Sequence, residues 1–149
     1  MKKFKFRLEP LKQYREFLER QKQLEVAKAR SDVLSCEQSI DQTRAALLEA
    51  MSRLEDDLCK GMDAERFLRV KDYLSVLESF ENMEKKRLGR LIETLTRRQK
   101  ELAKKSVEKK AIEKLKLRQK EEYYTAMRKE EQKSLDDIVI LRKARSVII

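Results

Sequence analysis

The chain has 149 residues, and only one proline, Pro10, and two glycines, Gly61 and Gly89, interrupt it. Charged residues make up 43% of the chain, histidine and tryptophan are absent, and the formal net charge is +10. Proline and glycine disfavour helix interiors, so this composition is typical of long coiled-coil helices rather than of a globule with a thick core. Without histidine the chain lacks the commonest general base and metal ligand, which argues against an enzyme and against a metal site.

The first predicted element is a helix over residues 8–58. Small or apolar residues recur in it at alternating spacings of three and four, which is the pattern of a coiled-coil seam. They are Val26, Ala29, Val33, Cys36, Ile40, Thr43, Leu47, Ala50, Leu54 and Leu58. Upstream the stripe changes phase, to Leu11, Tyr14, Leu18 and Leu24. The change indicates either a stutter or a segment that faces something other than the second helix.

A break is predicted at residues 59–63, where Gly61 can end the first helix and Asp63 can cap the next one. A second helix is predicted over residues 64–145. Its apolar positions are Phe67, Val70, Leu74, Leu77, Phe80, Leu88, Leu91, Leu95, Leu102, Ile112, Leu115, Tyr123, Ala126, Leu135 and Ile138. A short loop between two long helices predicts an all-α fold, a long antiparallel two-helix coiled coil that forms one domain over residues 1–149.

The two predicted helices differ in length, at about 75 Å and about 120 Å for a rise of 1.5 Å per residue. Either the second helix overhangs the first at its C-terminal end, or residues 64–80 fold back as a separate short helix. The overhang is the favoured interpretation.

Charge is distributed unevenly along the chain. Residues 1–20 carry seven basic and three acidic side chains, residues 81–149 carry 21 and 12, and residues 21–80 carry nine and 12. In a hairpin this predicts a basic end that holds both termini and an acidic tip. The densest basic run comprises Arg97, Arg98, Lys100, Lys104, Lys105, Lys109 and Lys110.

The basic run is interpreted as a solvated helix face, with a contact to nucleic acid or to an acidic protein as the alternative. Nucleic acid is not expected as a partner, because no basic region leads into a parallel zipper and no aromatic platform is available for stacking bases. Tyr73, Leu77 and Phe80 are spaced either as seam residues or as an exposed patch that docks a partner.

Other site chemistry is not expected. Cys36 and Cys59 lie too far apart for a metal-ligand motif and are predicted to be reduced thiols. Neither a phosphate-binding glycine loop nor a Ser-His-Asp set is present, so no catalytic residue and no cofactor are predicted. No export signal and no window approaching the roughly 20 apolar residues of a membrane span were found, which predicts a cytoplasmic protein.

Several segments of the chain resemble those of one known family. They are Phe4–Leu11, Tyr14–Arg15, Gln21–Glu25, Glu113–Arg118, Glu121–Tyr123 and Glu130–Asp137. Over nearly its whole length the chain thereby resembles the FliJ family of flagellar type III export proteins. The resemblance implies a non-catalytic, stalk-like coiled coil at the flagellar base, cytoplasmic and peripherally associated with the inner membrane.

The resemblance also implies partners, namely the hexameric flagellar export ATPase, the cytoplasmic domain of the membrane export gate, and export substrate chaperones that the protein escorts. It assigns ATPase binding to Arg7, Leu8, Leu11, Arg15, Arg118, Lys133 and Asp136. It assigns export-gate binding to Tyr73, Leu77 and Phe80. Ala46 and Ala50 depart from the family pattern, because larger aromatic residues can occur there. The equivalent stalk of a virulence secretion system and a generic nucleic-acid-binding coiled coil are the alternatives.

Overall fold

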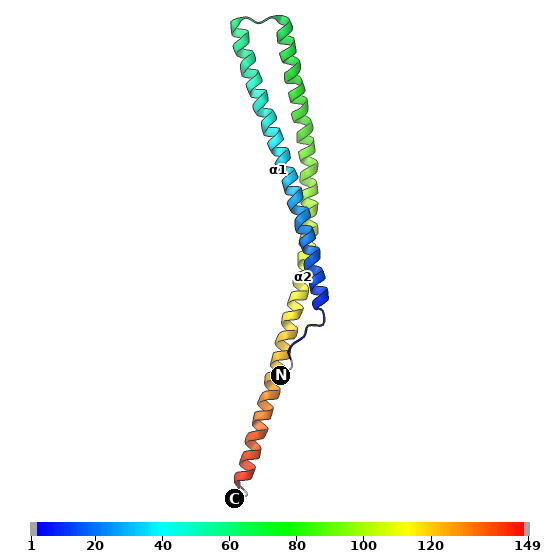
Figure 1. Cartoon of the computed structure of the whole chain (residues 1–149), viewed down its shortest axis with the longest axis vertical. Coiled ribbons are helices and arrows are strands. Elements are labelled where there is room, and N and C mark those ends of the chain that lie inside the picture. Colours follow the sequence, from blue (N-terminus) through cyan, green and yellow to red (C-terminus); the bar gives the residue numbers. More distant parts are fainter. Residues whose placement is uncertain (1–2, 148–149) are drawn as a thin grey trace. The chain divides into compact units, whose positions relative to one another are not determined.

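The computed structural model describes residues 3–147, which form two helices joined by a short turn (Figure 1). Helix α1 spans Glu9–Lys60, with 52 residues, and helix α2 spans Ala64–Val147, with 84 residues. The helices pack against each other and the described residues contain no strand, which confirms the predicted all-α hairpin. Because α2 is continuous from Ala64, residues 64–80 do not form a separate helix.

Gly61 is the residue at which the chain leaves α1. Its φ of +89° lies in the left-handed region, which glycine adopts readily and which strains a residue with a Cβ atom. The amide of Gly61 donates to the carbonyl of Leu58 at 3.3 Å, and the carbonyl of Asp63 accepts the amide of Phe67 at 3.0 Å. Asp63 therefore takes the N-cap position of α2.

Close approaches between Cα atoms divide the chain into two compact units. Unit 1 comprises Met1–Glu19 and Lys104–Ile149, and unit 2 comprises Arg20–Ala103. Each unit contains a segment of α1 packed against a segment of α2. The two units use different chemistry for that contact, since unit 2 has an apolar seam whereas unit 1 relies on ion pairs and aromatic contacts.

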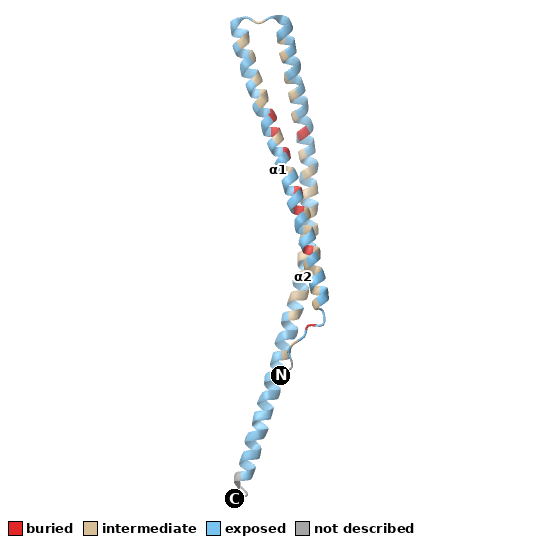
Figure 2. Cartoon of the chain, in the orientation of Figure 1, coloured by how far each residue is buried: buried red, intermediate tan, exposed pale blue. Residues whose placement is uncertain are grey.

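The core of unit 2 is a seam of small and apolar side chains on the side of α1 that faces α2 (Figure 2). Val26, Ala29, Cys36 and Ile40 are buried there at the predicted three-four spacing. Opposite them Glu84 is also buried, and the thiol of Cys36 donates to its carbonyl oxygen at 3.4 Å and to its Oε2 at 3.6 Å. Burial, together with the nearby carboxylate of Glu84, raises the pKa of the Cys36 thiol. This cysteine is therefore a neutral core residue.

In unit 1 the non-helical residues 3–8 lie against α2. Phe6 is buried, and Nζ of Lys116 lies 5.8 Å from the centroid of its ring. The ring of Phe4 lies 5.7 Å from that of Tyr123. A cation over an aromatic face is attracted by the ring quadrupole, and tilted ring pairs add to area burial. These contacts hold the N-terminal segment on the helix.

Several residues predicted to line the seam are exposed instead. They are Leu58 in unit 2 and Leu115, Ala126, Leu135 and Ile138 in unit 1. Within unit 1, α1 begins at Glu9, whose carboxylate lies 2.7 Å from Nζ of Lys116. All residues of α2 from 128 to 145 are exposed, because no helix of unit 1 remains to pair with these later turns.

Candidate partner-binding surfaces

Ion pairs join α1 to α2 in unit 1 where a coiled coil would place apolar side chains. Nζ of Lys109 lies 2.7 Å from Oε2 of Glu19, which is buried, and Lys116 pairs with Glu9 at the same distance. The hydrogen bond from Lys109 lowers the pKa of Glu19, and that from Lys116 lowers the pKa of Glu9. In return, Glu19 raises the pKa of Lys109. Glu19 and Lys109 therefore each favour the charged form of the other.

The first turns of α1 carry their apolar side chains on the outside of unit 1. Leu8, Leu11, Tyr14 and Phe17 are all exposed, Tyr14 and Phe17 to 55% each. The charged side chain of Glu19 faces α2 in their place. The phase change in the sequence therefore marks a face that points away from α2 rather than a stutter. These side chains follow one another at intervals of three residues, and exposed apolar side chains grouped in this way are typical of a contact with another protein.

All seven residues that the resemblance assigns to ATPase binding lie in unit 1. They are Arg7, Leu8, Leu11, Arg15, Arg118, Lys133 and Asp136. All but Arg15 are exposed. Arg15 pairs with Glu108 of α2, and its Nε is buried without an acceptor, so this residue joins the two helices of unit 1. The exposed guanidinium of Arg118 lies 2.9 Å from Glu122 on its own helix.

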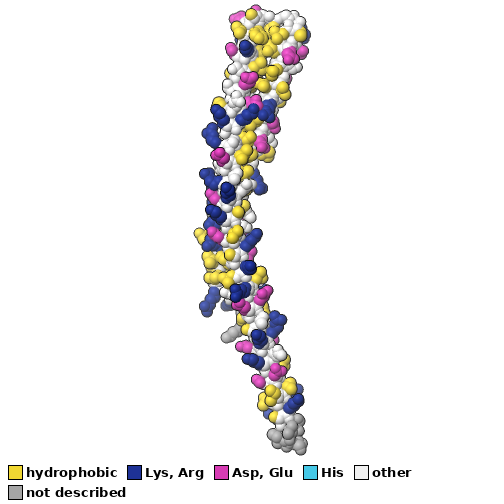
Figure 3. Space-filling view, turned by 180° about the vertical axis from the view of Figure 1, so that it is seen from behind, with side chains coloured by type: hydrophobic (Ala, Val, Ile, Leu, Met, Phe, Trp, Pro, Cys, Tyr) yellow, Lys and Arg dark blue, Asp and Glu magenta, His cyan; other side chains and the backbone are white. Residues whose placement is uncertain are grey.

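An apolar stripe on α2 within unit 1 was not predicted from the sequence. Leu117 and Tyr124 are exposed seven residues apart, and Leu135 and Ile138 fall within about 60° of them around the helix. Figure 3 shows apolar side chains among charged ones along this part of α2. The seven-residue spacing of Leu117 and Tyr124 could have predicted this stripe. Tyr123, the neighbour of Tyr124, was predicted to lie in the seam instead.

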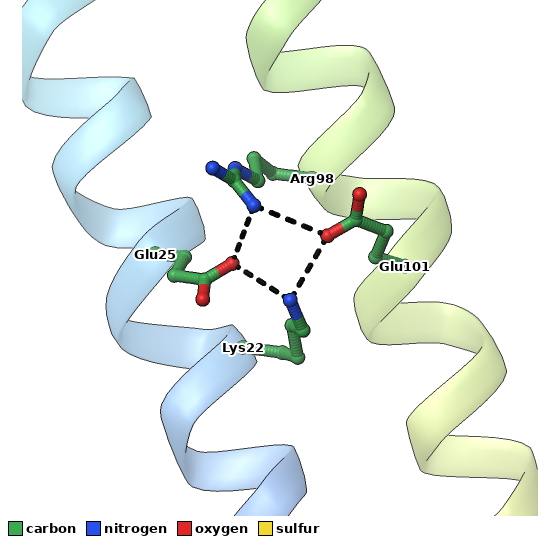
Figure 4. Close-up of polar contacts among 4 residues, drawn as sticks. All are labelled: Lys22, Glu25, Arg98 and Glu101. Carbon is green, nitrogen blue, oxygen red and sulfur yellow. Dashed lines mark hydrogen bonds and ion pairs between the residues drawn. The ribbon is translucent and has the colours of Figure 1, made fainter.

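Four charged side chains form a closed cluster between α1 and α2 in unit 2 (Figure 4). Nζ of Lys22 lies 3.0 Å from Oε2 of Glu25 and 3.0 Å from Oε2 of Glu101. Nη1 of Arg98 lies 2.9 Å from Glu25 and 3.3 Å from Glu101. The hydrogen bonds to Glu25 and Glu101 raise the pKa of Lys22, and the bond from Lys22 lowers the pKa of Glu101. Because solvent reaches all four, salt should screen the cluster.

Acid is expected to loosen the contacts between the helices. The lowered pKa values of Glu9, Glu19 and Glu101 give stability that is complete above the ordinary glutamate value of 4.5 and is lost as the pH falls through the folded-state values. The raised pKa values of Lys22 and Lys109 give stability that is complete below 10.5 and is lost at higher pH. The melting temperature should stay level from neutral pH to about pH 5 and then decline.

Glu19→Gln provides the control for this pH dependence. The variant should melt at a lower temperature than the parent at neutral pH, and the difference should shrink in acid. A parent protein whose melting temperature rises below pH 4.5 would contradict the assigned pKa directions.

The predicted basic run of α2 divides between ion pairs and solvent. Arg98 belongs to the four-charge cluster of unit 2, whereas in unit 1 Lys105 lies 3.3 Å from Glu108 and Lys109 pairs with Glu19. The remaining members are exposed, namely Arg97, Lys100, Lys104 and Lys110. Part of the run therefore joins the helices, and the rest forms a solvated face.

The residues that the resemblance assigns to gate binding lie on α2 in unit 2. Tyr73 and Phe80 are exposed, and Leu77 is half-buried. From their spacing, these residues could have been part of the seam. Because Tyr73 and Phe80 are exposed, they are not part of it. Val76 and Met83 are exposed close to them in the sequence, so this segment of α2 has more exposed apolar side chains than the three that were predicted.

A groove of about 280 Å³ lies between α1 and α2 in the part of unit 2 that adjoins the turn. Its apolar lining comes from Ala46, Ala50 and Leu54 of α1 and from Val70 and Tyr73 of α2. Figure 3 shows apolar side chains gathered between the two helices near the turn. The groove is therefore continuous with the surface that contains Tyr73.

Reactive and metal-binding groups are sparse. Among residues 3–147, no three side chains of histidine, cysteine, aspartate or glutamate are grouped so that they could hold a metal ion. Cys36 is buried, Cys59 is exposed, and both are free thiols. In the described part of the chain, neither helix has a stretch long and apolar enough to cross a membrane.

These features define a helical hairpin of the coiled-coil class, with exposed apolar faces of the kind that mark contacts with other proteins. Within that class the chain belongs to the FliJ family, since the sequence model of the flagellar FliJ protein matches residues 4–147. The match confirms the resemblance and identifies a protein related to flagellar export, in a family of non-catalytic export components. Comparison with curated proteins and with solved structures gave no match.

Proposed function

We propose that this protein is a stalk-like component of the flagellar type III export apparatus. It binds the hexameric export ATPase, engages the cytoplasmic domain of the membrane export gate, and escorts export substrate chaperones. It acts in the cytoplasm, peripherally associated with the inner membrane at the flagellar base. The family match over residues 4–147 carries the proposal, and it favours the flagellar system over a virulence system.

Unit 1 is the proposed ATPase-binding part. Its N-terminal part has exposed apolar side chains at Leu8, Leu11, Tyr14 and Phe17, which can lose water when a partner covers them. The segments that make up unit 1 are rich in lysine and arginine, with Arg7 next to these apolar side chains. Basic side chains around an apolar centre would steer an acidic partner and orient it on that centre.

Unit 2 is the proposed gate-binding part. Tyr73 and Phe80 are large, exposed and aromatic, and such residues commonly supply most of the binding energy of an interface. Helix α2 places them seven residues apart, two turns along one face, so one flat partner surface can contact both. Leu77 lies between them, half-buried, and can contribute both to the fold and to the interface.

Binding of the full chain to the purified export ATPase and to the gate cytoplasmic domain tests the proposal. For the gate, Tyr73→Ala and Phe80→Ala should each weaken affinity by about 1–2 kcal/mol, roughly 5- to 30-fold, while the melting temperature changes little. Leu68→Ala is the matched control, because Leu68 is an exposed apolar residue of the same helix. A marked fall in melting temperature with unaltered gate affinity would return Tyr73 and Phe80 to a structural role.

A further inference from the structure

A row of basic side chains follows one exposed side of α2 within unit 2. At about 100° and 1.5 Å per residue, its members fall within about 80° of one another around the helix and within about 21 Å along it. All of them are exposed, and they are named the basic stripe: Lys86, Arg90, Arg97 and Lys100. Glu93 is the one acidic residue in the segment from 86 to 100, so the stripe is strongly positive.

The protein itself does not neutralise the basic stripe. Neighbouring cations of α2 are paired, since Nζ of Lys85 lies 2.8 Å from Oε1 of Glu81 and Nη1 of Arg98 lies 2.9 Å from Oε2 of Glu25. Within the described part of the chain, none of the four side chains of the stripe forms an ion pair. Their positive charge therefore remains available to attract an anionic partner.

A glycine in the interior of α2 lies beside the basic stripe. Gly89 falls within about 60° of Lys86 and about 20° of Lys100 around the helix, and glycine weakens a helix at such a position. A Cβ atom on Gly89 would meet nothing within 4 Å, so packing inside the protein does not require this glycine. Because no side chain projects there, a partner surface can approach the backbone of α2 closely between the cations.

The arrangement of the four cations favours a flat anionic surface over other polyanions. A helix in the major groove of a DNA duplex has a phosphate backbone on both of its flanks, whereas these cations share one side of α2. The stripe contains no aromatic side chain on which the bases of a single strand could stack. An acidic protein would need carboxylates at matching positions, whereas a layer of anionic headgroups presents negative charge opposite every cation.

We propose that the basic stripe binds the anionic headgroups of a phospholipid bilayer, so that the α2 segment of unit 2 lies along the membrane surface. This inference rests on the proposed peripheral association with the inner membrane, and it adds that the chain contacts lipid directly. The stripe has no apolar side chain that could insert into the bilayer. Its attachment is therefore electrostatic, reversible and weakened by salt.

Sedimentation of the purified full chain with lipid vesicles tests this proposal. The parent should bind vesicles of mixed phosphatidylglycerol and phosphatidylcholine at low salt, bind more weakly at moderate salt, and not bind phosphatidylcholine alone. The stripe variant is Lys86→Gln/Arg90→Gln/Arg97→Gln/Lys100→Gln. Its affinity for the mixed vesicles should fall at least about 100-fold, because each basic residue near an anionic surface contributes roughly fivefold.

A control variant removes the same charge from other places in unit 2. It is Lys28→Gln/Arg30→Gln/Arg69→Gln/Lys71→Gln, whose four parent residues are exposed and spread over both helices. This variant should bind the mixed vesicles within about tenfold of the parent, since the stripe is intact. Both variants should keep the helicity and most of the melting temperature of the parent, because exposed positions tolerate glutamine in a helix.

Three results would overturn the proposal. If the parent fails to bind the mixed vesicles at low salt, the stripe does not bind lipid. Equal loss of affinity in the two variants would mean that net charge, rather than the stripe, attracts the membrane. Tighter binding to duplex DNA than to the mixed vesicles at equal phosphate concentration, lost in the stripe variant, would assign the stripe to nucleic acid. The vesicles contain no export protein, so these failures are distinct from failure of binding to the ATPase or to the gate.

Discussion

Ile40→Ala is expected to lower the free energy of unfolding by about 2–4 kcal/mol, because truncation of a buried isoleucine loses apolar burial and leaves a cavity. Ile40 is 5% exposed and lies in the seam of unit 2, which is only one or two side chains wide. Native proteins have about 5–15 kcal/mol of stability in total, so this single change should remove a large part of it. Urea unfolding measures this change, with the helix content followed by far-ultraviolet circular dichroism.

Leu48→Ala provides the control for this experiment. Leu48 lies on the same helix, but 67% of its surface is exposed, so its truncation should change stability by less than about 0.5 kcal/mol. Equal losses for the two variants would contradict the seam, since they would mean that Ile40 and Leu48 are buried to a similar extent. If both variants lost little free energy of unfolding, contacts other than this seam would stabilise unit 2.

The hairpin and its apolar seam could be predicted because both depend on local rules. Glycine at Gly61 adopts the backbone conformation that ends a helix, and Val26, Ala29, Cys36 and Ile40 repeat at the spacing of a helix pair. These signals depend on backbone sterics and helix periodicity, which act over a few residues. They can therefore be recognised without knowledge of the opposite helix.

The sequence could not predict which of two competing faces the opposite helix would cover. At the start of α1, an apolar face with Leu11 and Tyr14 competes with a charged face, and the charged face packs on α2. The partners of that face are distant in sequence, as Lys109 is from Glu19. No periodic pattern within a few residues of Glu19 can therefore predict the pairing. Burial of Glu84 was missed for the same reason, because a glutamate is expected at the surface unless its partner is known.

Reversal of charge at Arg7 and Arg118 is expected to weaken binding to the export ATPase at least about tenfold, or 1.4 kcal/mol, if unit 1 is the ATPase-binding part. Both side chains are exposed in unit 1. The Arg118–Glu122 pair at 2.9 Å is a surface contact within one helix, which contributes little to stability. The Arg7→Glu/Arg118→Glu variant should therefore keep its helicity and most of its melting temperature, whereas attraction for the ATPase is lost.

The control for this variant must carry the same change in net charge at another place. Arg30→Glu/Arg69→Glu does so within unit 2, where both arginines are exposed. Binding measured at low and at moderate salt should distinguish the pairs, because an electrostatic interface loses affinity as salt screens it. The parent and the unit 2 variant should bind tightly at low salt, and the unit 1 variant should bind weakly at both concentrations. Equal loss in the two double variants would mean that overall charge attracts the ATPase, and unchanged binding of the unit 1 variant would remove Arg7 and Arg118 from the interface.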